Sequence, residues 1–293
     1  MKKMQGSLML LLTALIWGMA FVVQRSGMEL IGPYTFQAVR TLLASAALLP
    51  LALWRKKRLG ADFRMPRPGL ALTCGLLVGC ACLAQQVGLT TTPAGKAGFI
   101  SSLYVVAVPV LGLLLGRRAG ARVWLGVALS VAGLYLISAV GSFSLDRGEW
   151  LMLLCAALSA VHIVVIDRYG AACDAVMLSC QQFFIAGLLP LPLAFTLEKP
   201  AFEAVWQAKW LILYAGVMSS AVGYTLQTLG QKRVAPATAS LILCLESVFA
   251  AVLGALILHE TLSPREMLGC ALMLAAVVIC QLPAGRKKRM EEK

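Results

Sequence analysis

The chain has 293 residues, of which 60% are hydrophobic and 13% are charged. Soluble domains have roughly 45–50% apolar and about 25% charged residues, so a soluble fold of this length could not bury so much apolar surface. The net charge of +13 comes from basic residues that lie between apolar runs. This pattern argues against nucleic-acid binding and predicts an integral membrane protein in contact with a lipid bilayer.

Ten apolar stretches are each long enough to cross a bilayer, which takes about 20 residues in a helix. The connections are short and carry most of the charge, so no segment remains for a soluble domain. The Met-Lys-Lys start resembles a secretory signal, but no small-residue cleavage site follows, and we interpret it as leading into an uncleaved first span. The expected spans are Gly6–Val23, Thr35–Trp54, Gly69–Val87, Lys96–Leu115, Val123–Val140, Glu149–Val165, Ala175–Phe195, Trp210–Leu229, Thr238–Leu258 and Arg265–Leu282.

The lysines and arginines are distributed unevenly between alternate connections. With a cytoplasmic N-terminus, 19 of the 26 lie in cytoplasmic segments, six lie outside, and Arg40 lies within a span. The positive-inside rule therefore favours two cytoplasmic termini, which requires an even number of spans. The basic cytoplasmic tail, 286–293, is interpreted as the closing topogenic signal, with specific lipid binding as the alternative. The tight loops suit a bacterial inner (plasma) membrane, although a eukaryotic compartment is the other option.

An internal repeat appears when the chain is shifted by 143 residues. Segments 93–137 and 236–280 then share 12 of 45 positions, and Leu125-Gly126 falls on Leu268-Gly269. One residue earlier in register, Gln85 falls on Gln227. The sequence therefore predicts two repeats of five spans, 1–142 and 146–285.

Five is an odd number of spans, so the second repeat enters the membrane upside down. Inverted repeats are the layout that alternating-access transporters use, although some channels contain them too. The predicted fold class is an all-α membrane protein, with ten transmembrane helices in two inverted repeats around a central cavity.

Charged residues inside the spans are the first candidates for function, because an ionisable group in a bilayer is costly. Glu246 is the acidic residue expected near the middle of a helix; it can bind a proton or a cationic substrate group, or be a structural carboxyl paired with Arg40. The guanidinium of Arg40 can bind a substrate carboxylate, or snorkel or join helices. His162 suits proton coupling, but a lone histidine on an apolar helix is more often a satisfied core residue. Lys96 either reaches the interface or attracts anions at the cavity mouth.

Uncharged polar and aromatic residues form a second set of candidates. A buried amide or hydroxyl needs a partner, which a water-filled cavity, a substrate or another helix can supply. Cavity lining and interhelical hydrogen bonding both stay open for these side chains, and packing is the default for the aromatic ones. The set consists of Trp17, Gln85, Gln86, Tyr104, Tyr224 and Gln227.

Other features are interpreted as structural. The nine cysteines form no CxxC pair and no His/Cys cluster, so we expect free buried thiols and no metal. The segment Ser263-Pro-Arg-Glu266 fits a helix capping box. Several glycines are expected to let helices approach closely. They are Gly75, Gly79, Gly112, Gly126, Gly133, Gly254 and Gly269.

Several motifs resemble the EamA family of the drug/metabolite transporter superfamily. They are the Trp17-Gly-x-x-Phe21 run, Pro33-x-x-Phe36-x-x-x-Arg40, Thr92-Pro-Ala-Gly-Lys through Val108-Pro109, Glu246-Ser-Val-Phe-Ala, Leu258-His-Glu260 and Leu268-Gly269. The similarity covers nearly the whole chain in two copies. It implies ten helices around a central cavity and transport of amino acids, nucleotide-like or other small metabolites, often as export.

Two positions depart from the family's pattern. Ser247 follows Glu246 where the family often has proline, and Arg117 stands where an acidic residue often ends the fourth helix. Both departures bear on the substrate rather than on the fold.

These features favour a secondary transporter for small metabolites such as amino acids or related polar and amphipathic compounds. A proton is the expected driver, because Glu246 and His162 are present, and facilitated exchange is the alternative. Neither a phosphate-binding loop nor paired intramembrane carboxylates occur in the sequence, so no cofactor and no enzymatic activity are expected. A channel or receptor-like membrane protein is the main competing function, and a membrane enzyme is the weaker one.

Overall fold

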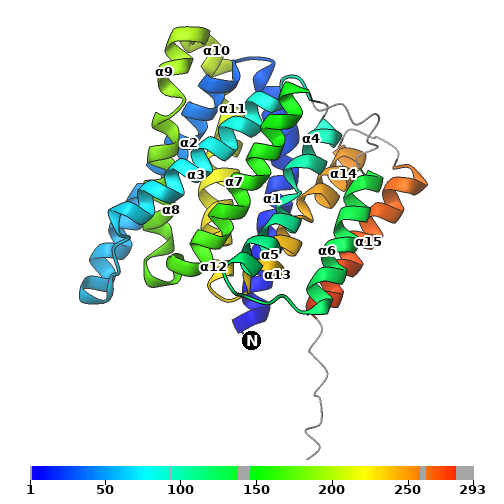
Figure 1. Cartoon of the computed structure of the whole chain (residues 1–293). Helices are drawn as coiled ribbons and strands as arrows, with labels where there is room; N and C mark the ends of the chain where they lie inside the picture. The colour runs from blue at the N-terminus through cyan, green and yellow to red at the C-terminus, as the bar shows by residue number, and fades with distance from the viewer. Residues whose placement is uncertain (1, 93, 138–145, 258–261, 282–293) are drawn as a thin grey trace, which may run out of the picture.

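The computed structural model describes residues 2–92, 94–137, 146–257 and 262–281, without the side chains of 25, 94–96, 254, 255 and 257. Within these ranges every regular element is helical, and the long helices form one bundle (Figure 1). Eight helical stretches are long and apolar enough to cross a membrane, and Ala121–Ile137 is a shorter apolar helix. The structure is therefore that of an all-α membrane protein.

The first repeat contains six α-helices and a short 3₁₀ turn, η1 (Gly60–Asp62). Prolines stand at the first position of several helices in both repeats, where the missing N–H is not needed. The helices are α1 (Lys2–Met28), α2 (Pro33–Leu59), α3 (Pro68–Gly88), α4 (Ala94–Ser101), α5 (Tyr104–Leu114) and α6 (Ala121–Ile137).

The second repeat is more subdivided. The expected capping box starts its last helix: the Glu266 carboxylate accepts hydrogen bonds from Ser263 N and Oγ at 2.7 Å each, so this prediction is confirmed. The elements are α7 (Arg147–Tyr169), η2 (Gly170–Ala172), α8 (Ala175–Leu188), α9 (Leu191–Leu193), η3 (Ala194–Glu198), α10 (Phe202–Gln207), α11 (Lys209–Leu213), η4 (Tyr214–Gly223), α12 (Tyr224–Gln231), α13 (Pro236–Leu243), α14 (Glu246–Ile257) and α15 (Pro264–Gln281).

Four expected spans differ in form from the structure. The seventh, Ala175–Phe195, ends its regular α-helix at Leu188 and continues through α9 into the π-helix η3. The fourth and ninth were predicted as continuous helices, but α4 and α5 are interrupted at Ser102–Leu103, and α13 and α14 at Cys244–Leu245. The eighth contains the π-helix η4 between α11 and α12. The helix α2 also runs past its expected end at Trp54 to Leu59, because Lys56, Lys57 and Arg58 favour the negative end of the helix dipole.

Helices of the first repeat pack mainly against helices of the second repeat. Helix α1 contacts η4, α12 and α14 of the second repeat, as α7 contacts α3, α4 and α5 of the first. Helix α2 packs on η4 as α8 packs on α3, and the equivalent helices pair with each other, α2 with α8 and α6 with α15. Exchanging the two repeats reproduces the same set of contacts, so the bundle has an approximate two-fold axis.

The repeats also run in opposite directions. A Cβ on Gly6 of α1 would touch Arg233 and Val234 at the end of α12, whereas a Cβ on Gly148 of α7 would touch Thr91 at the end of α3. The α1 start and the α12 end therefore lie together at one end of the bundle, and α7 starts at the other end. The inverted orientation predicted from the odd number of spans matches these contacts.

The pair α6–α15 shows the symmetry in detail. A Cβ on Gly133 would lie 2.7 Å from the carbonyl oxygen of Gly269, and one on Gly126 would lie 3.3 Å from that of Ala276. The 143-residue shift converts the first contact into the second. Small residues thus allow close backbone approach, as expected. Gly112 is an exception, since only the Arg117 carbonyl, at 4.0 Å, would approach its Cβ, and the Gly254 surroundings lie outside the described residues.

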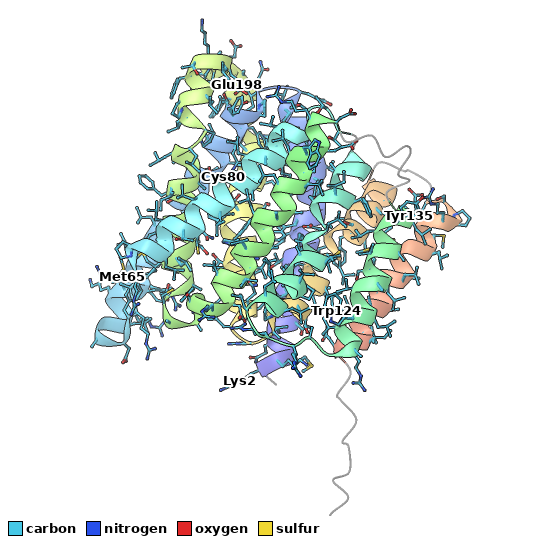
Figure 2. All side chains as sticks on the ribbon, viewed as in Figure 1. Lys2, Met65, Cys80, Trp124, Tyr135 and Glu198 are labelled. Carbon is cyan, nitrogen blue, oxygen red and sulfur yellow. The ribbon has the colours of Figure 1, made fainter. Side chains whose placement is uncertain are left out.

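One end of the bundle, called the basic end below, carries most of the described basic side chains. Figure 2 shows Lys2, Met65 and Trp124 toward this end and Glu198 at the opposite end. Arg55 pairs with Asp174 at 2.7 Å, and Arg117 pairs with Asp167 near the end of α7. The clusters around 55 and 118 therefore share one end, as the positive-inside topology requires.

Candidate functional site

The two interrupted helices meet in the middle of the bundle. Their breaks lie one residue apart under the 143-residue shift, and the hydroxyls of Ser102 and Ser247 are 3.3 Å from each other across the interface. At the breaks the backbone tightens, with Leu103 N bonded to Ile100 O and Leu245 N to Ile242 O. Interrupted helices at membrane depth occur in transporters where the backbone lines a cavity.

Glu246 is the first residue of α14, directly after the second break. Its side chain is buried, and Oε1 accepts hydrogen bonds from the Tyr104 hydroxyl at 3.3 Å and the Ser102 hydroxyl at 3.4 Å. Both donors come from the other repeat. A carboxylate at a helix N-terminus is also favoured by the helix dipole, so this position can hold a negative charge or a proton.

A cavity lies beside this junction and offers about 60 Å³ of space to the centres of water molecules. Its lining is unusually polar and aromatic for the inside of a helix bundle. The lining residues are Trp17, Ala20, Phe21, Gln24, Arg40, Val78, Ala81, Cys82, Gln85, Ser101, Tyr104, Cys155, Ser159, His162, Ile163, Ser219, Tyr224, Gln227 and Glu246.

Arg40 supplies the positive charge of the cavity. Its side chain is 3% exposed, and Nε donates to Gln37 Oε1 at 2.8 Å. Among the described residues it forms no ion pair with Glu246, and its two terminal nitrogens have no hydrogen-bond partner. A buried guanidinium with free donors can bind a carboxylate or phosphate group through two parallel hydrogen bonds, that is, in bidentate geometry.

Aromatic rings form one wall of the cavity, centred on Tyr224. The Trp17 ring lies 4.7 Å and the Phe183 ring 5.1 Å from it, centroid to centroid. Trp17 Nε1 donates to the Ser219 carbonyl in η4 at 3.1 Å, and His162 Nε2 lies 3.1 Å from Gln182 Oε1. These bonds fix the orientations of the Trp17 and His162 rings beside Tyr224.

Most residues singled out from sequence meet in this cavity. The lining includes Trp17, Arg40, Gln85, Tyr104, His162, Tyr224, Gln227 and Glu246. Gln86 does not line it; the side chain is fully buried, and neither amide atom has a partner among the described residues. The Lys96 side chain lies outside the described part of the chain. The placement of these residues is geometric, and their roles stay predictions.

Sequence reasoning missed several lining residues, among them Gln24, Cys82 and Ser159. These are small or common side chains whose direction depends on helix rotation, which a hydropathy pattern does not fix. The adjacent serines at 101 and 102 were an available signal, because serine pairs are one source of helix kinks. No comparable signal marks Cys244.

Comparison with known proteins follows the same division into two halves. The model of the EamA-like transporter family matches residues 4–139 and again 146–281. The chain belongs to the EamA-like transporter family. The prediction from motifs is therefore confirmed, and with it membership of a group of membrane transporters.

Relatives cover nearly the whole EamA-like chain. An uncharacterized transporter of Archaeoglobus fulgidus is 32% identical over 96% of this chain and 87% of its own length. An uncharacterized inner membrane transporter of Escherichia coli, YedA, is 26% identical over 92% of this chain and 88% of its own. A chloroplastic WAT1-related protein of Arabidopsis thaliana is 28% identical over 92% and 67%. These names point to transporters rather than enzymes.

A solved crystal structure shares the fold. It superposes with a TM-score of 0.81 at 18% identity, covering 96% of this chain and 98% of the other. At this identity the match shows a shared fold and nothing about the substrate.

Proposed function

We propose that this protein is a secondary transporter that moves a small metabolite across a plasma membrane by alternating access. The observation that carries the proposal is the cavity beside the two interrupted helices. It holds a buried guanidinium with free donors, Arg40, and a buried carboxylate, Glu246, on opposite repeats. A site shared by two inverted halves can open to either side when the halves exchange conformations.

The ligand that such a cavity fits is a small polar or amphipathic molecule, with amino acids and related compounds as the first class to test. Arg40 would meet an anionic group, Glu246 a cationic group or a proton, and the Trp17–Tyr224 wall an apolar part. Proton coupling through Glu246 is the expected drive, and export is the expected direction.

In this proposal the chain crosses the membrane ten times, with both termini in the cytoplasm. The continuous helical stretch from α11 through η4 to α12 provides the eighth span, and α6 provides the fifth. Labelling with an impermeant thiol reagent tests the topology, with one cysteine introduced at 57 or at 118 in a variant whose nine native cysteines are replaced. Both should react from the cytoplasmic side, and labelling from opposite sides would contradict it.

Transport is tested with purified protein in proteoliposomes and a panel of labelled amino acids and other small metabolites, with and without a pH gradient. We expect saturable uptake with counter-flow of at least one compound. Glu246→Gln and Arg40→Gln should each reduce uptake about 10- to 100-fold, because hydrogen bonds to charged groups are worth roughly 1.5–3 kcal/mol.

The matched control is Glu203→Gln, an exposed carboxyl of α10 outside the cavity. Its uptake should equal that of the wild type. Uptake that rises linearly with concentration and shows no counter-flow would indicate a channel, and full activity of both cavity variants would remove the proposed site.

A further inference from the structure

Helix α2 of the first repeat packs antiparallel against helix α8 of the second repeat. Midway along them the Ser45 hydroxyl donates to the Cys180 carbonyl at 2.9 Å, and the Cys180 thiol donates back to the Ser45 carbonyl at 3.4 Å. Close by, a Cβ on Gly187 would lie 2.6 Å from a side-chain carbon of Leu42. The two helices are therefore in close contact along the middle of the pair, where a rocking motion would pivot.

At the basic end, the last turns of α2 are tied to the start of α8. Arg55 Nε and Nη2 donate to Asp174 Oδ2 at 2.9 and 2.7 Å. The other oxygen of Asp174 accepts from the backbone N–H groups of Val176 and Met177 at 3.1 and 3.0 Å, which caps α8. We call this contact the basic-end tie.

At the opposite end, the roles of the two helices are exchanged. Glu198 ends η3, which continues α8, and its carboxylate accepts from Tyr34 N at 2.9 Å, Thr35 N at 2.7 Å and Thr35 Oγ1 at 2.6 Å. It thereby caps the N-terminus of α2. A Cβ on Gly32 would lie 2.1 Å from the Glu198 carboxyl carbon, so only glycine leaves room for this contact. We call it the opposite-end tie.

The two ties are related by the repeat. Adding the shift of 143 to position 55 gives 198, so Arg55 falls on Glu198. In the opposite-end tie, Glu198 contacts the N-terminus of α2 directly. In the basic-end tie, Arg55 contacts the N-terminus of α8 through the Asp174 carboxylate. Arg55 lies 10 residues from Ser45, and Glu198 lies 18 residues from Cys180, so the two ties lie roughly 15 and 27 Å along the helices from the Ser45–Cys180 contact, on opposite sides of it.

We propose that the basic-end tie and the opposite-end tie are alternating latches, each of which holds one end of the transporter closed. The inference rests on the proposed alternating access. The two open states of an inverted-repeat transporter are related by exchange of the halves. In one open state the basic-end tie is therefore broken and the opposite-end tie is kept, and in the other open state the reverse holds. Both ties are formed in this structure, which corresponds to a conformation closed at both ends of α2–α8.

Hydrogen–deuterium exchange of the purified full-length protein tests the latches without reference to any substrate. Glu198→Ala should raise exchange of the backbone amides at 34–38 about tenfold, the effect of losing hydrogen bonds to a charged group. In the same variant, amides at 174–179 should exchange more slowly than in the wild type. Arg55→Ala should give the reverse pattern.

Three further variants keep the test independent of folding defects. Gly32→Ala displaces Glu198 while keeping its charge and should reproduce the Glu198→Ala pattern. Gly69→Ala, at the start of α3 where nothing lies within 4 Å of the added Cβ, is its control. Lys57→Ala, an exposed basic residue beside Arg55, is the control for the basic end.

Amide exchange at the end of the α2–α8 pair that was not mutated distinguishes alternating latches from local helix caps. A cap with only a local structural role would loosen its own helix start and leave the other end as in the wild type, and this result would overturn the latches. Loosening of both ends together would overturn them as well. Reciprocal exchange without substrate transport would instead uphold the latches and contradict the proposed function.

Discussion

The central crossing of α4–α5 with α13–α14 differs from the outer pair α6–α15, although both are built from repeat-related helices. The outer pair is packed through glycines, with Gly133 and Gly269 backbone to backbone. The crossing is interrupted, and hydroxyls and the Glu246 carboxylate meet across it. Close small-residue packing fixes the outer pair, whereas the polar crossing leaves room for a ligand. We therefore expect changes at the crossing to alter transport, and changes at the outer pair to alter stability.

The largest expected effect is a block of the cavity by thiol modification. Cys82 lines the cavity with its sulfur 3.4 Å from the Tyr224 hydroxyl, whereas Cys80 on the same helix is exposed on the outside. A small thiol reagent should abolish proteoliposome transport, and the double variant Cys82→Ala/Cys155→Ala, which removes both thiols that line the cavity, should restore most of it. Cys80→Ala should leave the inhibition unchanged. Equal protection by both variants would show that the cavity is not the transport path.

Gly133→Leu should break the outer pair. The added side chain meets Gly269 and Met273 at less than 3 Å, and overpacking of this kind destabilises by about 3 kcal/mol. Thermal unfolding in detergent should move to a clearly lower temperature, while substrate affinity of the folded fraction stays unchanged. Gly69→Leu serves as the control. A loss of affinity without a loss of stability would contradict the division between the two regions.

Tyr104→Phe removes one hydrogen bond from Glu246 without changing the shape of the crossing. The loss of one hydrogen bond is worth about 0.5–1.5 kcal/mol, or roughly 2- to 10-fold in rate or affinity. Transport should fall by that factor while the unfolding temperature stays within about a degree. Tyr135→Phe in α6 should have no effect on transport. A large change in stability with unchanged transport would assign Tyr104 to packing.

The smallest effect is expected from Gln86→Leu, which can be compared with its neighbour. Gln85 lines the cavity, so Gln85→Leu should weaken apparent substrate affinity a few-fold. Gln86 is buried with both amide atoms unpaired in the described structure, so an apolar side chain of similar size should be neutral or stabilising by up to about 1 kcal/mol. Uptake kinetics and thermal unfolding of both variants check this. Greater damage by Gln86→Leu would reveal a role for its amide.

Sequence patterns gave the class of fold and much of the site in advance. Hydropathy alone marked the apolar segments, because lipid contact requires long apolar helices, and the 143-residue repeat predicted inversion. Charge inside apolar segments singled out Glu246 and Arg40, both of which line the cavity. The same reasoning predicted Gln85 and Gln86 as equal candidates for the cavity, although only Gln85 lines it. Composition does not reveal how a helix is rotated about its axis.

The sequence by itself determined that this protein is a helical membrane protein with two repeats, since the length of the apolar segments and the 143-residue shift can be read without knowing which helices touch. The tertiary structure decided where the helices break, that Arg40 and Glu246 stand apart rather than paired, and that Arg55 and Glu198 form equivalent ties. Those features depend on contacts between residues more than 100 positions apart. Such contacts arise only when the two halves pack against each other.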